Sequence, residues 1–336
     1  MLKIIKEGML TSVQDLGRTG YQKYGVIVSG SMDSYAHRIA NLLVGNEENA
    51  AALEATLLGP EIEFKQDSMI AICGGDLSPT INGQKVNTWR SIFVKEGSVL
   101  KFGKSRTGCR AYIAVTGGLD IQEVMDSQST YLRAKLGGYQ GRALKSGDQL
   151  PMVHPNDMQR KLMDSIRQRM GSNYVYETDW MPAADMIPEY SSQPVIQMLR
   201  GPQYALFNEQ SQRIIYEEPY SVSSQSDRMG YRLEGSPLSL TESKELISEA
   251  VAFGSIQVPS DGNPIILMAD RQTTGGYPKI GQIASVDLPL VSQLKPGDQI
   301  SFREVTLEEA QRALIDQEKS IQILKRSITL KSKEEL

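Results

Sequence analysis

One stretch of the sequence, residues 253–278, places several chemically useful side chains next to one another. An apolar run at 265–269 is typical of a buried strand, and polar residues and a glycine pair follow it directly. A rigid strand that ends in a glycine-rich turn is a common support for a binding or catalytic site. A solvated β-turn would explain the glycines alone. Gln257 on one side, with Asp270 and Gln272 on the other, favours a site.

Polar residues on other glycine turns extend this candidate site. Arginine forks and amide side chains suit a planar, urea-like or carboxylate-bearing small molecule. An aspartate in such a setting could orient a proton or act as a base, so Asp270 and Asp15 are the candidate catalytic residues. The alternative is that these charged residues form structural ion pairs that brace the loops. The candidate substrate-binding residues are Gln14, Arg18, Asp33, Arg228, Gln257, Gln272, Thr273 and Tyr277.

The small number of histidines and cysteines limits the other chemistries. His37 and His154 are too few for a histidine-based zinc or iron site, and a Ser-His-Asp triad would need one of them. Cys73 and Cys109 do not make a disulfide framework, and Cys73 is expected to close a buried strand as a small hydrophobic residue. We therefore expect no metal site.

One short segment, Gly103-Lys104-Ser105, is similar to the end of a phosphate-binding loop. The nearest preceding glycine, Gly97, is one residue too far away, and the segment that follows, 106–115, is expected to be a strand. A phosphate-binding loop needs the N-terminus of a helix at that point. Any ATP would therefore be held by other means, for example in a site shared with a partner.

Composition excludes several classes of protein. The 336 residues carry 36 basic and 40 acidic side chains, for a net charge of −4. This balance argues against a nucleic-acid or anionic-membrane surface as the main partner. No apolar run approaches the roughly 20 residues that span a bilayer. The first ten residues include Lys3, Lys6 and Glu7, so they lack the apolar core of a signal peptide. These observations predict a cytoplasmic protein that binds neither nucleic acid nor membrane.

Short strands are expected to build most of the chain. Apolar residues recur at helical spacing over 33–44, where Asp33 can cap a helix. From residue 50 to 115, short apolar segments alternate with turn residues, which indicates an all-β barrel or sandwich. A capping box at Thr306 and Glu309 begins a terminal helix. The predicted domains are an N-terminal β-barrel at 1–153, a linker at 154–194, and a C-terminal β-barrel with the terminal helix at 195–336.

Several motifs, found in order along nearly the full chain, resemble the biotin-dependent carboxyltransferase family, which is also called allophanate hydrolase subunit 2. The resemblance implies a mainly β fold of two cyclophilin-like β-barrel domains with a few peripheral helices. The motifs that carry it include Gln14-Asp15-x-Gly17-Arg18-x-Gly20, Ser29-Gly30-x-Met32-Asp33, Leu53-Glu54, Asp227-Arg228-Met229-Gly230-Tyr231-Arg232-Leu233 and the whole of 253–278.

The resemblance also implies an activity. Stand-alone bacterial members of this length resemble the C subunit of 5-oxoprolinase, which works with subunits A and B to open 5-oxo-L-proline to L-glutamate with ATP hydrolysis. The implied activity is an ATP-dependent lactam hydrolase that needs these partner subunits. One alternative is a binding module that antagonises a sensor-kinase inhibitor, the homologue of the B subunit. Another is a carboxyltransferase component that acts on urea-like amides with a separate biotin protein, since this chain has no biotin-attachment Ala-Met-Lys-Met sequence.

Overall fold

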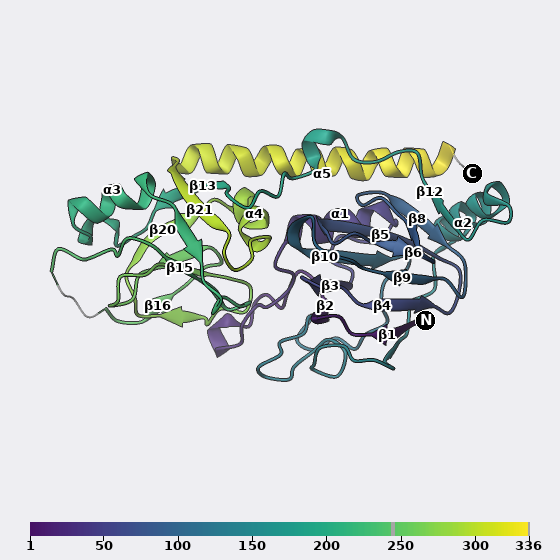
Figure 1. The fold of residues 1–336 in the computed structure, drawn as a ribbon, viewed down its shortest axis with the longest axis horizontal. Coiled ribbons are helices and arrows are strands. Elements are labelled where there is room, and N and C mark those ends of the chain that lie inside the picture. The colour runs from purple at the N-terminus through teal and green to yellow at the C-terminus, as the bar shows by residue number, and fades with distance from the viewer. Residues whose placement is uncertain (243–245, 335–336) are drawn as a thin grey trace. The chain divides into compact units, whose positions relative to one another are not determined.

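The computed structural model describes residues 1–242 and 246–334 (Figure 1). The chain forms two compact units. The first contains Met1–Gly17, Asp33–Pro188 and Lys319–Leu336, and the second contains Arg18–Met32 and Glu189–Glu318. This division differs from the predicted domain boundaries. A short N-terminal segment belongs to the second unit, and most of the predicted linker belongs to the first.

The first unit is built from two six-stranded sheets. One sheet has the order β11 (Gln149–Leu150), β1 (Leu2–Lys6), β4 (Glu61–Phe64), β9 (Val99–Lys101), β6 (Thr80–Ile81) and β7 (Gln84–Lys85). The other has the order β12 (Val175–Glu177), β8 (Ser91–Val94), β5 (Ser68–Asp76), β10 (Thr107–Val115), β3 (Ala52–Thr56) and β2 (Leu10–Gln14). The mainly β prediction is confirmed. A closed barrel occurs in the second unit, whereas the first unit has these two sheets.

Strand β10 shows why this region folds as it does. It pairs with β3 on one side and β5 on the other. Ala111, Ile113 and Val115 alternate along it and join the main apolar core. Side chains of a strand alternate between the two faces of its sheet, so Tyr112 points the other way, where its ring meets that of His37 edge-on on helix α1 (Ser34–Leu43). Both faces of the strand are therefore buried.

The region predicted as a linker has regular structure. Helix α2 (Asp157–Met170) begins at a capping box of Asn156 and Gln159. Met163, Ile166 and Met170 pack against Met69 and Phe93, which lie on β5 and β8. Strand β12 then extends the second sheet by pairing with β8. This segment is held in place by contacts with residues that are distant in the sequence, and its composition alone does not reveal them.

The second unit contains a closed seven-stranded barrel. Its order is β13 (Val195–Arg200), β20 (Lys279–Ile283), β17 (Ser255–Gln257), β18 (Ile265–Leu267), β15 (Gly230–Glu234), β14 (Tyr220–Val222) and β21 (Gln299–Glu304). Closure of the barrel gives every strand a hydrogen-bonded neighbour on both sides. Apolar residues that alternate along the strands, such as Ile196, Ile256, Ile266 and Ile280, fill the interior. A two-stranded ribbon, β16 (Glu249–Ala250) with β19 (Thr274–Gly275), accompanies the barrel.

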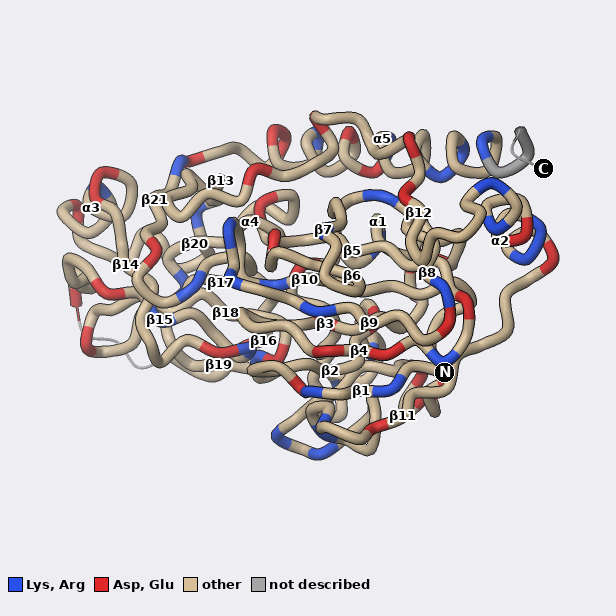
Figure 2. Tube along the Cα trace, turned by 45° about the vertical axis from the view of Figure 1, so that its right-hand side comes forward, with Lys and Arg blue, Asp and Glu red and all other residues tan. Residues whose placement is uncertain are grey.

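Helices are few and short, apart from the last one. Helix α5 (Leu307–Glu334) starts at the predicted capping box, where the Thr306 backbone N–H donates to Glu309 and the Glu309 N–H donates to Thr306. Its charged residues are mainly acidic up to Glu318 and mainly basic from Lys319 onward (Figure 2). No helix in the described residues is long and apolar enough to span a membrane. The remaining helical elements are α3 (Glu209–Glu217), α4 (Leu288–Ser292) and the 3₁₀ turns η1 (Gln22–Tyr24), η2 (Ala184–Met186), η3 (Tyr204–Leu206) and η4 (Ser285–Asp287).

Candidate functional site

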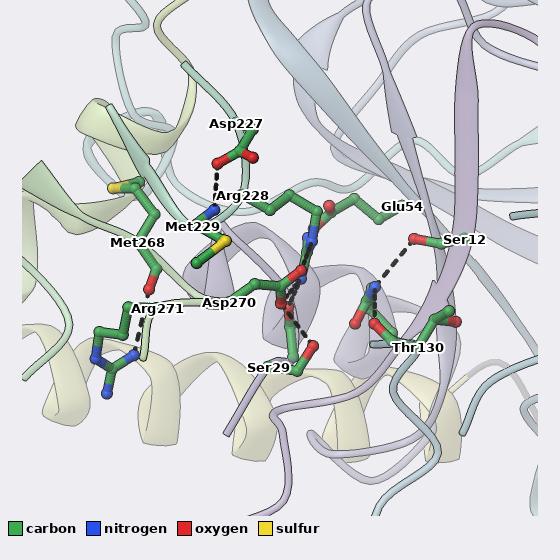
Figure 3. A network of polar contacts seen from close by, with 12 residues as sticks. Ser12, Ser29, Glu54, Thr130, Asp227, Arg228, Met229, Met268, Asp270 and Arg271 are labelled. Atoms are coloured by element: carbon green, nitrogen blue, oxygen red, sulfur yellow. Dashed lines mark hydrogen bonds and ion pairs between the residues drawn. The ribbon is translucent and has the colours of Figure 1, made fainter. Parts of the chain in front are cut away.

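A buried ion pair joins Asp270 to Arg228 in the second unit (Figure 3). Arg228 precedes β15 and Asp270 follows β18, and these strands are antiparallel neighbours with Gly230 opposite Leu267. The Asp270 backbone N–H donates to the Arg228 carbonyl at 2.8 Å, which holds the two residues side by side. Arg228 Nε donates to Asp270 Oδ2 at 3.0 Å and Nη2 to Oδ1 at 3.1 Å. Asp270 is 5% exposed and Arg228 is 6% exposed.

The turn at Ser29 and Gly30 completes this cluster. Ser29 Oγ donates to Asp270 Oδ1 at 2.7 Å, and Arg228 Nη2 donates to the Gly30 carbonyl. Ser29 has φ 57° and Gly30 has φ 88°, so both lie in the left-handed region. A serine there is strained, and such strain often accompanies functional sites. The sequence prediction missed Ser29, although it belongs to a motif that carried the family resemblance.

The chemistry of this cluster follows from its burial. A carboxylate and a guanidinium fixed side by side offer an acceptor and charged N–H donors on a rigid support. Hydrogen bonds to charged groups are stronger in a low-dielectric site than in water. An amide group has the same kinds of donor and acceptor, so a ligand amide would exchange with hydrogen bonds that Arg228 and Asp270 already make.

Gln14 and Asp15 lie in the first unit and are held by the loop at 127–130. Gln14 Nε2 donates to Ser12 Oγ at 3.0 Å and to the Thr130 carbonyl at 3.2 Å, while its buried Oε1 has no hydrogen-bond partner among the residues that the structure describes. Asp15 Oδ1 accepts from the Gly17 N–H and Ser127 Oγ, and Oδ2 accepts from the Gln128 N–H at 2.6 Å. These three bonds give Asp15 a bracing role in the described structure.

A separate buried polar cluster, in the first unit, contains Asp33, Tyr112 and Glu54. Asp33 caps α1 by accepting from the Ala36 N–H at 2.8 Å, and its own N–H donates to Tyr112 Oη at 2.7 Å. Tyr112 Oη in turn donates to Glu54 Oε2 at 2.7 Å. Burial, with Glu54 and Asp33 nearby, raises the pKa of Tyr112 well above its ordinary value. Glu54 was not among the predicted site residues, although the Leu53-Glu54 motif had marked it.

The other predicted residues of 253–278 are not gathered around Asp270. Gln257 is 5% exposed, and its Nε2 lies 3.5 Å from the Tyr277 carbonyl. A Cβ on Gly275 would lie 2.4 Å from that nitrogen, so any larger residue there would displace the Gln257 amide. Gln272 is exposed, and the Thr273 carbonyl accepts from the Val251 N–H. Arg18 is fully buried in the second unit, where its N–H donates to the Val28 carbonyl.

A cavity of about 560 Å³ lies in the second unit, with the half-exposed Tyr277 in its wall. Its volume falls within the range of small-molecule pockets. Most of the lining residues are apolar, and the side-chain hydroxyls come from Tyr277 and two serines. The lining residues are Phe207, Leu238, Ser239, Leu240, Leu246, Val258, Pro259, Ser260, Gly276, Tyr277 and Pro278.

The structure also bears on metal and phosphate binding. Within the described residues, no group of three or more His, Cys, Asp or Glu side chains is placed to hold a metal ion. Gly103-Lys104-Ser105 leads into β10, which is a strand as predicted. The segment therefore has no helix N-terminus to bind phosphate, and it is not a phosphate-binding loop.

The fold and the buried cluster define a class: a mainly β protein whose closed barrel carries an arginine–aspartate pair beside a strained serine turn. Residues 24–304 match the family described as carboxyltransferase domain, subdomain A and B, and the chain belongs to this family. It is 40% identical over 319 residues to the C subunit of 5-oxoprolinase from Escherichia coli (strain K12), covering 95% of this chain and 96% of that protein. The Haemophilus influenzae protein of the same name is 36% identical, with 92% and 93% coverage.

Larger enzymes contain a similar region. The crystal structure of the K. lactis urea amidolyase superposes with a TM-score of 0.86 at 32% identity, covering 96% of this chain and 20% of that chain. Urea amidolyase of Saccharomyces cerevisiae is 32% identical over 335 residues, and the match covers 96% of this chain and 18% of that protein. The chain thus spans about a fifth of these enzymes, and the family resemblance drawn from the motifs is confirmed.

Proposed function

We propose that this chain is the C subunit of an ATP-dependent 5-oxoprolinase, which converts 5-oxo-L-proline to L-glutamate together with homologues of subunits A and B. The observation that carries the proposal is the coverage of the match, which includes nearly all of this chain and nearly all of the relative. The match covers 95% of this chain and 96% of the E. coli 5-oxoprolinase C subunit. The urea amidolyases are instead about five times as long as the matched region.

The Arg228–Asp270 pair supports this proposal chemically. A five-membered lactam is a cis amide, so its N–H and its carbonyl lie on the same edge of the ring. A carboxylate beside a guanidinium presents the complementary acceptor and donors. In this proposal Asp270 accepts the lactam N–H, and Arg228 donates to the carbonyl oxygen as negative charge develops on it.

Partner subunits complete the proposed site. Gly103-Lys104-Ser105 leads into a strand, so this segment does not cradle the phosphates of ATP. The catalytic role proposed for this chain is accordingly to bind and orient the lactam. ATP is held by a partner subunit, or in a site that a partner shares with this chain.

Reconstitution tests the proposed function. Purified homologues of the three subunits are incubated with 5-oxo-L-proline and ATP, with and without this chain, and L-glutamate is measured. We expect ATP-dependent glutamate release by the complete set and loss of that release when this chain is omitted. Adding the chain back should restore it. Undiminished release without this chain would contradict the proposal.

The similarity to urea amidolyase favours one second candidate, a carboxyltransferase component that acts on a urea-like amide. Such an activity would need carboxybiotin on a separate protein. Transfer of ¹⁴C-carboxyl from a carboxylated biotin protein to urea by this chain would support it. Absence of transfer alongside active 5-oxoprolinase would decide for the first proposal.

A further inference from the structure

Lys279, the first residue of β20, has its charge buried in the second unit. The residue is 7% exposed, and its Nζ donates to Glu249 Oε2 at 2.8 Å. Burying an ammonium group is costly unless an anion pairs with it. The anion that pairs with it here is the side chain of Glu249, which is 57% exposed. A buried cation thus depends on an acid that reaches in from the surface.

Gln203 adds a second donor to the same carboxylate. Its Nε2 donates to Glu249 Oε2 at 3.3 Å, while its Oε1 accepts from the Lys279 backbone N–H at 3.1 Å. The bond to the backbone fixes the amide so that its NH₂ group faces the carboxylate. An ammonium and an amide N–H that converge on one oxygen form a carboxylate-binding arrangement.

The two sides of this arrangement are anchored differently. Lys279 is a barrel residue, and Gln203 is held to it through the Gln203 N–H, which donates to the Lys279 carbonyl at 3.3 Å. Glu249 belongs to β16, which has two residues, both exposed, and pairs only with β19 in the described sheets. Glu249 can therefore leave Lys279 and Gln203 without breaking a strand pair of the closed barrel.

A second amide lies beside Lys279. Gln257 of β17 is the register partner of Lys279, so the two side chains lie on the same face of the sheet. Gln257 is buried, and its Nε2 makes a long contact of 3.5 Å with the Tyr277 carbonyl. Gly275 of β19 covers it closely, since a Cβ there would lie 2.4 Å from that nitrogen. The β16–β19 ribbon thus supplies both Glu249 and the cover over Gln257.

We propose that Lys279 and Gln203 form a carboxylate-binding site that Glu249 occupies as an internal ligand, and that a small molecule with both a carboxylate and an amide displaces Glu249. The carboxylate pairs with Lys279 and Gln203, and Gln257 lies beside this pairing on the same face of the sheet. The identity of the ligand as a lactam carboxylate such as 5-oxo-L-proline rests on the proposed function. The carboxylate site itself rests on the geometry of these side chains.

Removing the Glu249 carboxylate tests directly for the carboxylate-binding site. In a Glu249→Ala variant, we expect sodium acetate to raise the thermal midpoint of the purified chain relative to sodium chloride at the same ionic strength. The Glu249→Ala/Lys279→Met variant should lose this difference. Glu304→Ala, which removes the acid of the exposed Arg200–Glu304 pair on the same barrel, is the matched control and should show none. An equal acetate effect in the single and double variants would overturn the proposal.

Ligand binding by the chain alone tests the displacement. We expect Glu249→Ala to bind 5-oxo-L-proline at least about tenfold more tightly than the unmodified chain in calorimetric titration, because an internal ligand no longer competes. 2-Pyrrolidinone, the same lactam without the carboxylate, should show no such gain. Equal affinity of both proteins for 5-oxo-L-proline would refute the displacement.

The two proposals fail in different ways. These measurements use the chain without partner subunits or turnover, so an inactive reconstituted complex would contradict the proposed function and leave the acetate result standing. An active complex combined with no acetate effect in Glu249→Ala would overturn the carboxylate site alone.

Discussion

Replacing Asp270 with alanine is expected to abolish glutamate release by the reconstituted complex and also to destabilise this chain. The variant leaves the Arg228 guanidinium, which is 6% exposed, without its carboxylate. Removing one partner of a buried ion pair costs about 3–5 kcal/mol, because the remaining charge is uncompensated. Urea unfolding of the isolated chain measures the free energy of unfolding, and the glutamate assay measures the loss of activity.

A double variant separates these two effects. Asp270→Ala/Arg228→Met removes the unpaired charge, so we expect it to recover most of the lost stability while the complex stays inactive. Ser29→Ala is the matched mild control. It keeps the ion pair and removes one hydrogen bond to Asp270, at a cost of about 1 kcal/mol. Wild-type turnover in Asp270→Ala would give Asp270 a purely structural role, and a double variant as unstable as the two single changes added together would show that the pair is not coupled.

The stability of the chain is expected to fall as the pH drops from about 6.5 towards 4, because of His37. This side chain is fully buried, and burial lowers its pKa from 6.5 to about 4, although Asp15 and Glu54 oppose the shift. Between pH 6.5 and about 4, the His37 ring stays neutral in the native state, whereas the same ring in the unfolded chain binds a proton. The contribution of His37 to the free energy of unfolding is therefore fully present above its pKa in the unfolded chain. It is lost as the pH falls to its pKa in the folded chain, a change of about 3 kcal/mol.

A His37→Gln variant isolates this contribution. Other acids also titrate over this range, so the comparison is between the two proteins and not between two pH values of one. We expect the variant to be less stable near neutral pH, because the buried ring packs against Tyr112 and contacts Asn41. Between neutral pH and about pH 4.5, its free energy of unfolding should fall by about 2–3 kcal/mol less than that of the unmodified chain. Parallel pH curves for the two proteins would contradict the assignment to His37.

Local signals in the sequence predicted several elements correctly. The helix expected over 33–44 is α1, with Asp33 as its cap, because periodicity and capping depend on residues within one or two turns. The capping box at Thr306 and Glu309 likewise begins α5. The rejection of a phosphate loop at 103–105 needed only the strand pattern that follows it. The family could also be recognised, because its motifs are short and occur in order.

The linker prediction depended on composition, and composition does not report long-range contacts. Residues 154–194 have an irregular pattern, yet α2 is held by Met69 and Phe93, and β12 is held by β8. Such contacts are determined by residues far away in the sequence. For the same reason, a short N-terminal segment belongs to the second unit, although the order of the chain gives no sign of it.

Asp270 best illustrates the difference between what the local sequence determines and what the tertiary structure determines. Its position after an apolar run marks it as a candidate in the sequence alone, because a strand that ends in polar residues is a local pattern. Its partners could not be chosen in the same way. Arg228 lies 42 residues earlier in the sequence and Ser29 lies 241 residues earlier. The sequence by itself determined the strand, the turn and the family, whereas closure of the barrel decided which side chains meet, because burial forces charges from distant segments to pair with one another.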